Sequence, residues 1–306
     1  MWLTISIRVL ALATAVTSAV IVPRQSPTTI ATLPDSAWIE NIVVRSSGQV
    51  LLNRLDTPEL WSLDPITKQT TKLLSFSGAQ GLTGITEVAP DIFAVISGNA
   101  TVKGAISIKS GTWGVWKVDL TGSAPKATLV KVVPESGFFI GITPLNNDTV
   151  FIADAGKGSI YKFSLSTGQY SIAVSDASLT APTGSLIEEG VHGLKYHDGY
   201  LYYTNTFGNG FGKIKVDPAT GATNGAIIKS SGSFQAPEDF AIGPDGSAYI
   251  AQLSGGNVIK VTSEGQSSTV ARVSSCSSCA FGRTDKDKNT LYISTSGGAV
   301  LSVPVS

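Results

Sequence analysis

Three side chains of this sequence have the chemistry and the placement needed for proton transfer. The 306-residue chain contains only two histidines, and His197 lies in a Tyr-His-Asp-Gly turn where we expect it to be exposed. His192 instead precedes a Gly-Leu pair at the start of an apolar run, and Glu40 and Glu238 precede similar runs. An imidazole exchanges protons near neutral pH, and a carboxyl group can orient it or serve as the acid if its pKa is raised. We therefore predict His192, Glu40 and Glu238 as the catalytic residues.

Other kinds of catalysis have little support in the sequence. No Gly-x-Ser-x-Gly motif presents a nucleophilic serine, and neither cysteine has an obvious histidine partner. One methionine, two histidines and two cysteines are too few for a haem, an iron–sulfur cluster or a thiolate zinc site, and we predict no cofactor. Cys276 and Cys279 form a Cys-x-x-Cys motif without a second pair, which predicts a local disulfide in an oxidising compartment, with two free thiols as the alternative.

The charge content narrows the classes of partner. The 22 basic and 22 acidic residues cancel, and only 14% of the chain is charged, against ~25% in a typical domain. Such a chain has a hydrophobic core and is not intrinsically disordered. Without a net positive charge or a basic cluster it also lacks the electrostatic attraction that drives nucleic-acid binding, so we predict a small-molecule partner and no nucleic acid.

The first 19 residues have the order of a secretory signal peptide. Arg8 is followed by the apolar run Val9–Val16 and by small residues that suit cleavage. The run is shorter than the ~20 residues that a membrane span requires. We predict a signal peptide at 1–19, no membrane span, and a location in the secretory pathway or outside the cell. Two Asn-x-Thr sequons agree with this route, and we predict glycosylation at Asn99 and Asn147.

Beyond the signal peptide the chain reads as almost all β and as a sixfold repeat. Each segment has a short apolar strand, a turn, a second strand, a Gly-containing loop and a third strand, followed by a variable fourth. The repeats begin at Glu40, Thr83, Ile140, His192, Glu238 and Ser278. This plan predicts one domain over 20–306, a six-bladed β-propeller with four-stranded blades. Residues 28–33 should add the outermost strand to the last blade and close the ring.

The propeller prediction places a ligand site at one end of the central channel. The starts of the inner strands meet there, so the six repeat starts should ring the mouth. Thr83 and Lys103 are the predicted hydrogen-bond donors to a ligand. We expect two loops, 97–112 and 205–212, to overhang the same mouth. Side chains that could supply apolar walls, or else simply pack between blades, are Trp38, Phe138, Phe139, Ile140, Phe207 and Phe211.

The segments ENIVVRSSGQVLL, HGLKYHDGYLYYTNT and PEDFAIGPDGSAYIA resemble the senescence-marker-protein/gluconolactonase/luciferin-regenerating-enzyme family of six-bladed propellers. The resemblance spans about 28–306. It implies a divalent metal, often calcium, held by one Glu, two Asn and one Asp at the starts of four inner strands. In this chain those positions carry Glu40, Ile140, His192 and Glu238. An aliphatic side chain cannot ligate a metal, and imidazole suits borderline metals better than calcium, so we predict no metal.

The start PxxxWIENIxVRxxG and the finish CAFGR…LYISTSGG resemble a group of fungal propellers within this superfamily. The resemblance implies a hetero-Diels-Alderase of natural-product biosynthesis. Such an enzyme joins a tropolone-derived o-quinone methide to a humulene-type alkene by cycloaddition in an apolar pocket. The first alternative is a lactone hydrolase that holds a metal through Glu40, His192 and Glu238. The second is a secreted propeller that only binds partners.

Overall fold

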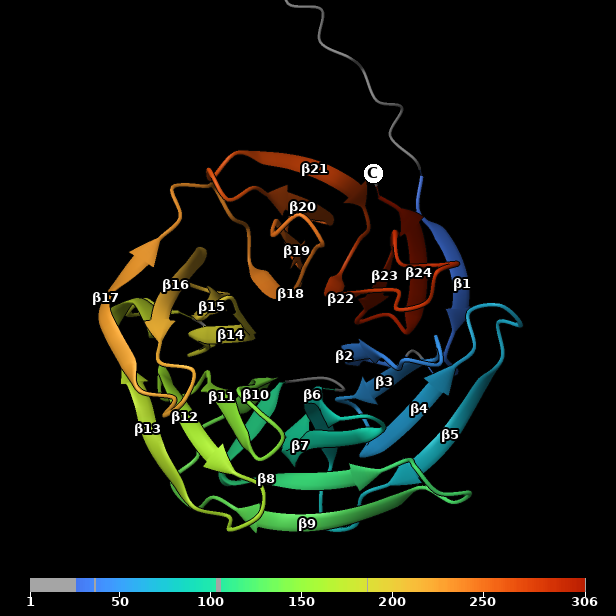
Figure 1. Ribbon diagram of the computed structural model, residues 1–306, viewed down its shortest axis with the longest axis horizontal. Coiled ribbons are helices and arrows are strands. Elements are labelled where there is room, and N and C mark those ends of the chain that lie inside the picture. Colours follow the sequence, from blue (N-terminus) through green and yellow to red (C-terminus); the bar gives the residue numbers. More distant parts are fainter. Residues whose placement is uncertain (1–25, 36, 103–105, 186, 306) are drawn as a thin grey trace, which may run out of the picture.

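The computed structural model describes residues 26–35, 37–102, 106–185 and 187–305. The strands form six four-stranded antiparallel sheets, arranged as blades around a central channel (Figure 1). The predicted all-β, six-bladed propeller is confirmed. The predicted signal peptide at 1–19 lies outside the described residues, and no described helix has the length and apolarity needed to cross a bilayer.

Each blade runs from an inner strand at the channel to an outer strand at the rim. The inner strands are β2 (Ile39–Val44), β6 (Gly81–Ala89), β10 (Phe139–Pro144), β14 (Val191–His197), β18 (Pro237–Ile242) and β22 (Cys276–Phe281). The second strands are β3 (Val50–Arg54), β7 (Ile92–Thr101), β11 (Thr149–Asp154), β15 (Tyr200–Asn205), β19 (Ala248–Gln252) and β23 (Thr290–Thr295). The third strands are β4 (Glu59–Leu63), β8 (Ser107–Asp119), β12 (Ser159–Ser164), β16 (Gly210–Val216), β20 (Asn257–Val261) and β24 (Ala299–Pro304). The outer strands are β5 (Thr70–Ser75), β9 (Lys126–Val132), β13 (Tyr170–Ser175), β17 (Thr223–Lys229), β21 (Ser267–Arg272) and β1 (Thr28–Thr32).

The last blade is completed by the amino-terminal strand, as the sequence predicted. β1 pairs antiparallel with β24, from Thr28 opposite Ser302 to Thr32 opposite Ala299. Figure 1 shows this blue strand beside the red carboxy-terminal strands. The ring is therefore closed by hydrogen bonds between the two ends of the domain. The edge of β24 that would otherwise be unpaired is covered by β1.

Burial explains why the strands near the channel are apolar. β3 and β19 are buried along their whole length, because a neighbouring blade covers each of their faces. The rim strand β9 is exposed at most positions and accordingly carries lysines and threonine. The low content of charged residues in the chain and the burial of these strands on both faces are thus consequences of the same architecture.

All six inner strands have an irregular register at their first residues. In β2 the pairing steps from Ile39 to Asn41, and in β14 from Val191 to Leu194; equivalent shifts occur in β6, β10, β18 and β22. A bulge leaves a residue out of the ladder and redirects its side chain. The residues skipped in this way include Glu40, Thr83, Ile140, His192, Glu238 and Ser277. Five of these are the predicted repeat starts; in the last blade Ser277 replaces the expected Ser278.

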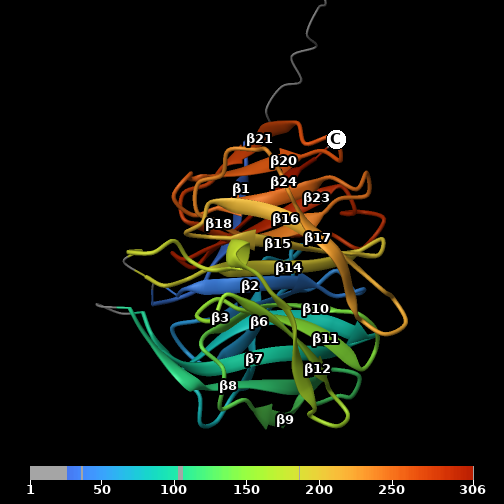
Figure 2. The ribbon, with the colours of Figure 1, turned by 90° about the vertical axis from the view of Figure 1, so that its left-hand side faces the viewer.

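Strand pairing extends into both segments that we expected to be loops. β7 runs to Thr101 and β8 begins at Ser107, so most of the 97–112 segment belongs to the two paired strands of a hairpin. Figure 2 shows this hairpin projecting from one face of the ring. In the 205–212 segment, β15 ends at Asn205 and β16 begins at Gly210, which leaves only a tight turn. The reason is that the pairing between the second and third strands of these blades includes residues whose types had indicated a loop.

The structure corrects the predicted disulfide, because both cysteines are free and buried. They lie three residues apart on β22, and that spacing along an extended strand separates the two Cα atoms by ~10 Å, beyond the ~7 Å that a disulfide tolerates. Each thiol instead contacts a carbonyl of β19: Cys276 that of Gln252 at 3.4 Å, and Cys279 that of Tyr249 at 3.0 Å. Burial also raises the pKa of both thiols, that of Cys276 to about 11, so they behave as core residues.

Candidate functional site

A cavity opens at the channel mouth, on the face from which the β7–β8 hairpin projects. The volume of this cavity is about 100 Å³. Its polar lining residues are Glu40, Glu189, His192, Thr206, Glu238 and Ser254. Its apolar lining residues are Trp38, Leu55, Ala100, Val102, Ile106, Ile108, Phe138, Ile140, Ile187, Phe207, Ala236 and Leu253.

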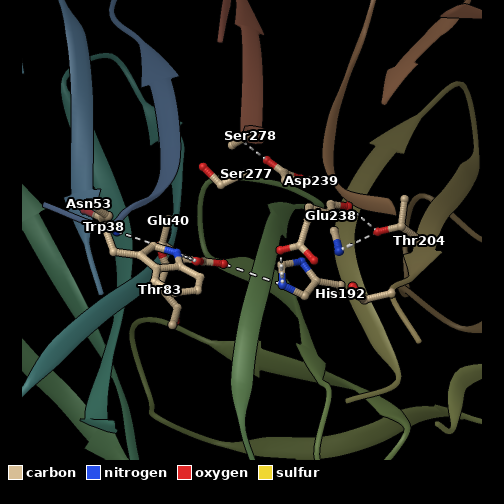
Figure 3. A network of polar contacts seen from close by, with 12 residues as sticks. Trp38, Glu40, Asn53, Thr83, His192, Thr204, Glu238, Asp239, Ser277 and Ser278 are labelled. Carbon is tan, nitrogen blue, oxygen red and sulfur yellow. Dashed lines mark hydrogen bonds and ion pairs between the residues drawn. The ribbon is translucent and has the colours of Figure 1, made fainter. Parts of the chain in front are cut away.

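The three predicted catalytic residues meet in this cavity. His192 Nε2 lies 3.1 Å from Glu238 Oε2 and 3.5 Å from Glu40 Oε1. Trp38 donates its indole N–H to Glu40 Oε2 at 2.7 Å, which fixes that carboxyl group. All three catalytic candidates are at most 4% exposed. Figure 3 shows Glu40 and His192 pointing toward each other, with Glu238 beside the imidazole.

Close packing of two blades brings His192 to Glu238. Gly193 donates its N–H to Thr204 Oγ1 at 2.8 Å, and the same hydroxyl donates to the carbonyl oxygen of Glu238. A Cβ on Gly193 would lie 2.8 to 2.9 Å from atoms of Asp239 and Glu238, closer than real Cβ contacts. A glycine after His192 is therefore required for β14 and β18 to approach this closely.

The environment gives these groups unusual proton affinities. Burial, helped by the charge of Glu238, raises the pKa of Glu40 to about 8, although His192 and the Trp38 hydrogen bond oppose the shift. Burial lowers the proton affinity of His192, but the carboxylates of Glu238, Glu40 and Glu189 outweigh it and raise the pKa of His192 to about 9. Burial thus favours the proton-bearing form of Glu40, and the acidic neighbours of His192 favour the cationic form of its imidazole.

Two buried polar atoms of the cluster have no hydrogen-bond partner among the described residues. They are Glu40 Oε1 and His192 Nδ1. An unpaired buried polar group costs about 1–3 kcal/mol, so proteins seldom retain one unless it has a further role. A protonated Glu40 and a protonated His192 would each offer a hydrogen-bond donor to an oxygen atom of a bound molecule.

The remaining predicted ligand-binding residues divide between the cavity and the core. Trp38, Phe138, Ile140 and Phe207 line the cavity. Thr83 donates its hydroxyl to the Phe139 carbonyl at 2.9 Å, and the Phe139 ring packs against Tyr161 in the core. Phe211 packs against Phe240 and faces a separate groove between blades four and five. Lys103 lies outside the described residues.

The sequence reasoning missed two parts of the cavity. The first is Glu189, on the irregular segment that precedes β14; its position three residues before His192 was the available signal. The second is a set of wall residues on the β7–β8 hairpin, Ala100, Val102, Ile106 and Ile108, which were not among the predicted site residues. The segment lies at the mouth as predicted, but it was expected to be a loop, and the spacing of two residues within each pair matches one face of a β-hairpin instead.

The donor set of the cluster does not fit the calcium site that the family resemblance implied. Ligand atoms of Glu40, His192 and Glu238 lie within 4.8 Å of one another. Calcium takes 6–8 oxygen ligands. Here the fourth position carries Ile140, which offers none, and one of the remaining three donors is an imidazole nitrogen. Two carboxylates and one imidazole suit a borderline ion such as zinc.

The predicted glycosylation sites lie in hairpins. Asn147 is exposed between β10 and β11. Asn99 is half-buried in β7, where its N–H donates to Thr112 Oγ1 at 3.1 Å. Modification at either residue stays a prediction.

Comparison with known proteins agrees with this architecture. A Phoma protein provisionally named a hetero-Diels-Alderase is 26% identical over 311 residues, covering 89% of this chain and 86% of its own length. The Sarocladium schorii protein provisionally named hetero-Diels-Alderase asR5 is 23% identical, covering 89% and 78%. The solved structure of regucalcin, a calcium-binding protein of Agrobacterium tumefaciens, shares the fold, with a TM-score of 0.66, 14% identity and coverage of 92% and 94%. The model of the SMP-30/gluconolactonase/LRE-like region matches residues 55–297, and the chain therefore belongs to that family.

Proposed function

We propose that this protein is a hetero-Diels-Alderase that unites a tropolone o-quinone methide with a humulene-type alkene at the channel mouth. The observation that carries the proposal is a cavity whose lining combines a buried acid–base cluster with aliphatic and aromatic side chains. The names of the two fungal relatives support the same reaction class.

The polar lining residues would generate and activate the heterodiene. Glu40, as a neutral acid, donates a proton to the hydroxyl group that leaves a hydroxymethyl precursor as water. The imidazolium of His192 donates a hydrogen bond to the oxygen of the quinone methide, which lowers the energy of its acceptor orbital. Glu238 compensates the imidazolium charge and holds the ring in place.

The apolar lining residues would bind the alkene and exclude water. The hairpin residues Val102, Ile106 and Ile108 line the same cavity as Phe138 and Phe207. The Phe138 ring is supported from behind by the buried Trp113, at 4.9 Å between ring centroids. Holding two reactants in near-attack geometry lowers a bimolecular barrier by up to ~7–11 kcal/mol, so the cycloaddition needs no covalent step with the protein.

The test is a reaction of a hydroxymethyl tropolone with humulene, with and without purified protein. We expect faster product formation and a changed diastereomer ratio. His192→Gln and Glu40→Gln should slow turnover ~10²–10⁴-fold. His197→Gln is the matched control, because His197 is the last residue of β14, lies beside Asp198 and does not line the cavity. This variant should retain full activity. A diastereomer ratio equal to that of the uncatalysed reaction would refute the proposal.

Lactone hydrolysis is the second candidate, and the donor cluster of Glu40, His192 and Glu238 favours it. A zinc-type ion bound there would polarise a lactone carbonyl. In that case zinc should raise the melting temperature, and chelation should abolish turnover of a simple sugar lactone. Turnover of the tropolone substrate that persists after chelation would instead exclude a metal-dependent site.

A further inference from the structure

A fourth ionisable side chain, Glu189, reaches the cavity from outside the ring of inner strands. It lies on the connection between blades three and four, after the short helix η1 (Ala177–Leu179) and before β14. It lines the same cavity as Glu40, His192 and Glu238. Figure 2 shows this connection projecting from the same face as the β7–β8 hairpin.

Its neighbour Gly190 anchors this segment, although neither residue belongs to a strand. Gly190 donates its N–H to the Ala155 carbonyl at 2.9 Å and accepts a hydrogen bond from the Thr206 N–H at 3.1 Å. A Cβ on Gly190 would lie 2.0 Å from the Leu179 carbonyl oxygen, so only glycine fits. The backbone next to Glu189 is therefore fixed between two blades, and this holds the carboxyl group at the mouth.

Glu189 differs from the other carboxyl groups in its contacts. Glu40 accepts the Trp38 N–H, and Glu238 pairs with His192. Within the described residues, no hydrogen bond or ion pair to the Glu189 carboxyl group is formed, and Glu189 is one of the residues that line the cavity. Burial raises the pKa of Glu189 to about 7, His192 opposes that shift and Glu238 adds to it, so a substantial fraction is ionised near neutral pH.

We propose that Glu189 is a further catalytic residue, the base that accepts the proton of the acidic ring hydroxyl group while Glu40 protonates the leaving hydroxyl group. This inference rests on the proposed function. It rests on the location of Glu189 at the cavity, on the opposite chemical tasks of an elimination and on the different contacts of the two carboxyl groups.

The step is a loss of water that balances without a redox partner. The ring O–H bond breaks, its proton passes to Glu189, and its electron pair forms the C=O bond. The ring double bonds shift, the C–O bond of the hydroxymethyl group breaks, and the departing oxygen takes the proton of Glu40 to leave as water. The products are the quinone methide, water, protonated Glu189 and ionised Glu40. Proton return through solvent resets the pair.

The experiment separates elimination from cycloaddition by using two substrates. One is the hydroxymethyl tropolone, which must lose water; the other is the quinone methide released in situ from a silyl-masked precursor by fluoride. Both are supplied with humulene to the unaltered protein, to Glu189→Gln and to Glu188→Gln. Glu188 is the matched control, because it is the exposed neighbour and does not line the cavity.

We expect Glu189→Gln to slow conversion of the hydroxymethyl substrate ~10²–10⁴-fold while the diastereomer ratio from the released quinone methide stays unchanged. Wild-type conversion by Glu189→Gln, or equal losses with both substrates, would overturn the assignment. If the unaltered protein affects neither substrate, the proposed function itself fails, which is a distinguishable result. Equal melting temperatures of the variants exclude unfolding as the cause of a loss.

Discussion

At the scale of single residues, three groups that line the site, two of them buried and Glu189 half-buried, share one property: each binds its proton more tightly in the folded chain. The pKa of Glu40 rises from 4.5 to about 8, that of Glu189 from 4.5 to about 7, and that of His192 from 6.5 to about 9. A raised pKa contributes stability that is complete below the unfolded value and is lost as the pH rises through the folded value. All three groups therefore make the free energy of unfolding fall between about pH 5 and pH 9.

Replacing Glu40 by Gln tests this linkage. The variant loses the titration of Glu40 and one of the carboxylates that raise the pKa of His192, so its stability should fall less steeply over that pH range. The measurement is denaturant unfolding at several pH values, and the quantity compared is the difference from the unaltered protein. Glu188→Gln, at an exposed site, should follow the unaltered curve. Parallel curves for Glu40→Gln would contradict the assignment of a neutral Glu40.

At the scale of strands, the hydroxyl group of Thr204 connects two inner strands beside the site. It accepts the Gly193 N–H and donates to the Glu238 carbonyl, and Thr204 is fully buried. Thr204→Val preserves the shape and removes both hydrogen bonds, so stability should fall by about 1–3 kcal/mol. The free energy of unfolding measures this loss. Thr128→Val on the exposed rim strand β9 is the control and should change stability little; an equal loss in both variants would mean that the hydrogen bonds contribute nothing.

Strand starts were the part of the site that the sequence could predict. Glu40, Ile140, His192 and Glu238 begin repeats whose apolar pattern fixes their register, and a bulge at each start directs them to the mouth. In the last blade the two neighbouring residues Ser277 and Ser278 are both small serines, so the sequence did not show which of them begins the repeat. The predicted start, Ser278, was one residue too late. Glu189 was missed because its segment has no periodic pattern; its position depends on tertiary contacts of Gly190. Phe139 and Phe211 were predicted from residue type alone, which does not distinguish a cavity wall from a core.

At the scale of the whole molecule, the site depends on a closed ring. Glu40, His192 and Glu238 come from three blades, and the distances of 3.1 and 3.5 Å between them require all the intervening blade contacts to be in place. The closing strand β1 can be removed without changing a site residue, and its loss would leave the last blade with three strands. Ile30 of β1 packs into the cluster of buried residues around Ile39 and Val44, next to the strand that carries Glu40.

Two truncations test whether ring closure supports the site. A chain that begins at Leu33 lacks β1, which leaves the edge of β24 unpaired and removes the packing of Ile30. Removing one buried isoleucine costs about 2–5 kcal/mol, and a loss of that size lowers the melting temperature of a domain this large by roughly 5–15 °C. A chain that begins at residue 26 keeps β1 and is the control. Equal melting temperatures for the two truncated chains, measured by circular dichroism, would show that the ring holds its stability without β1.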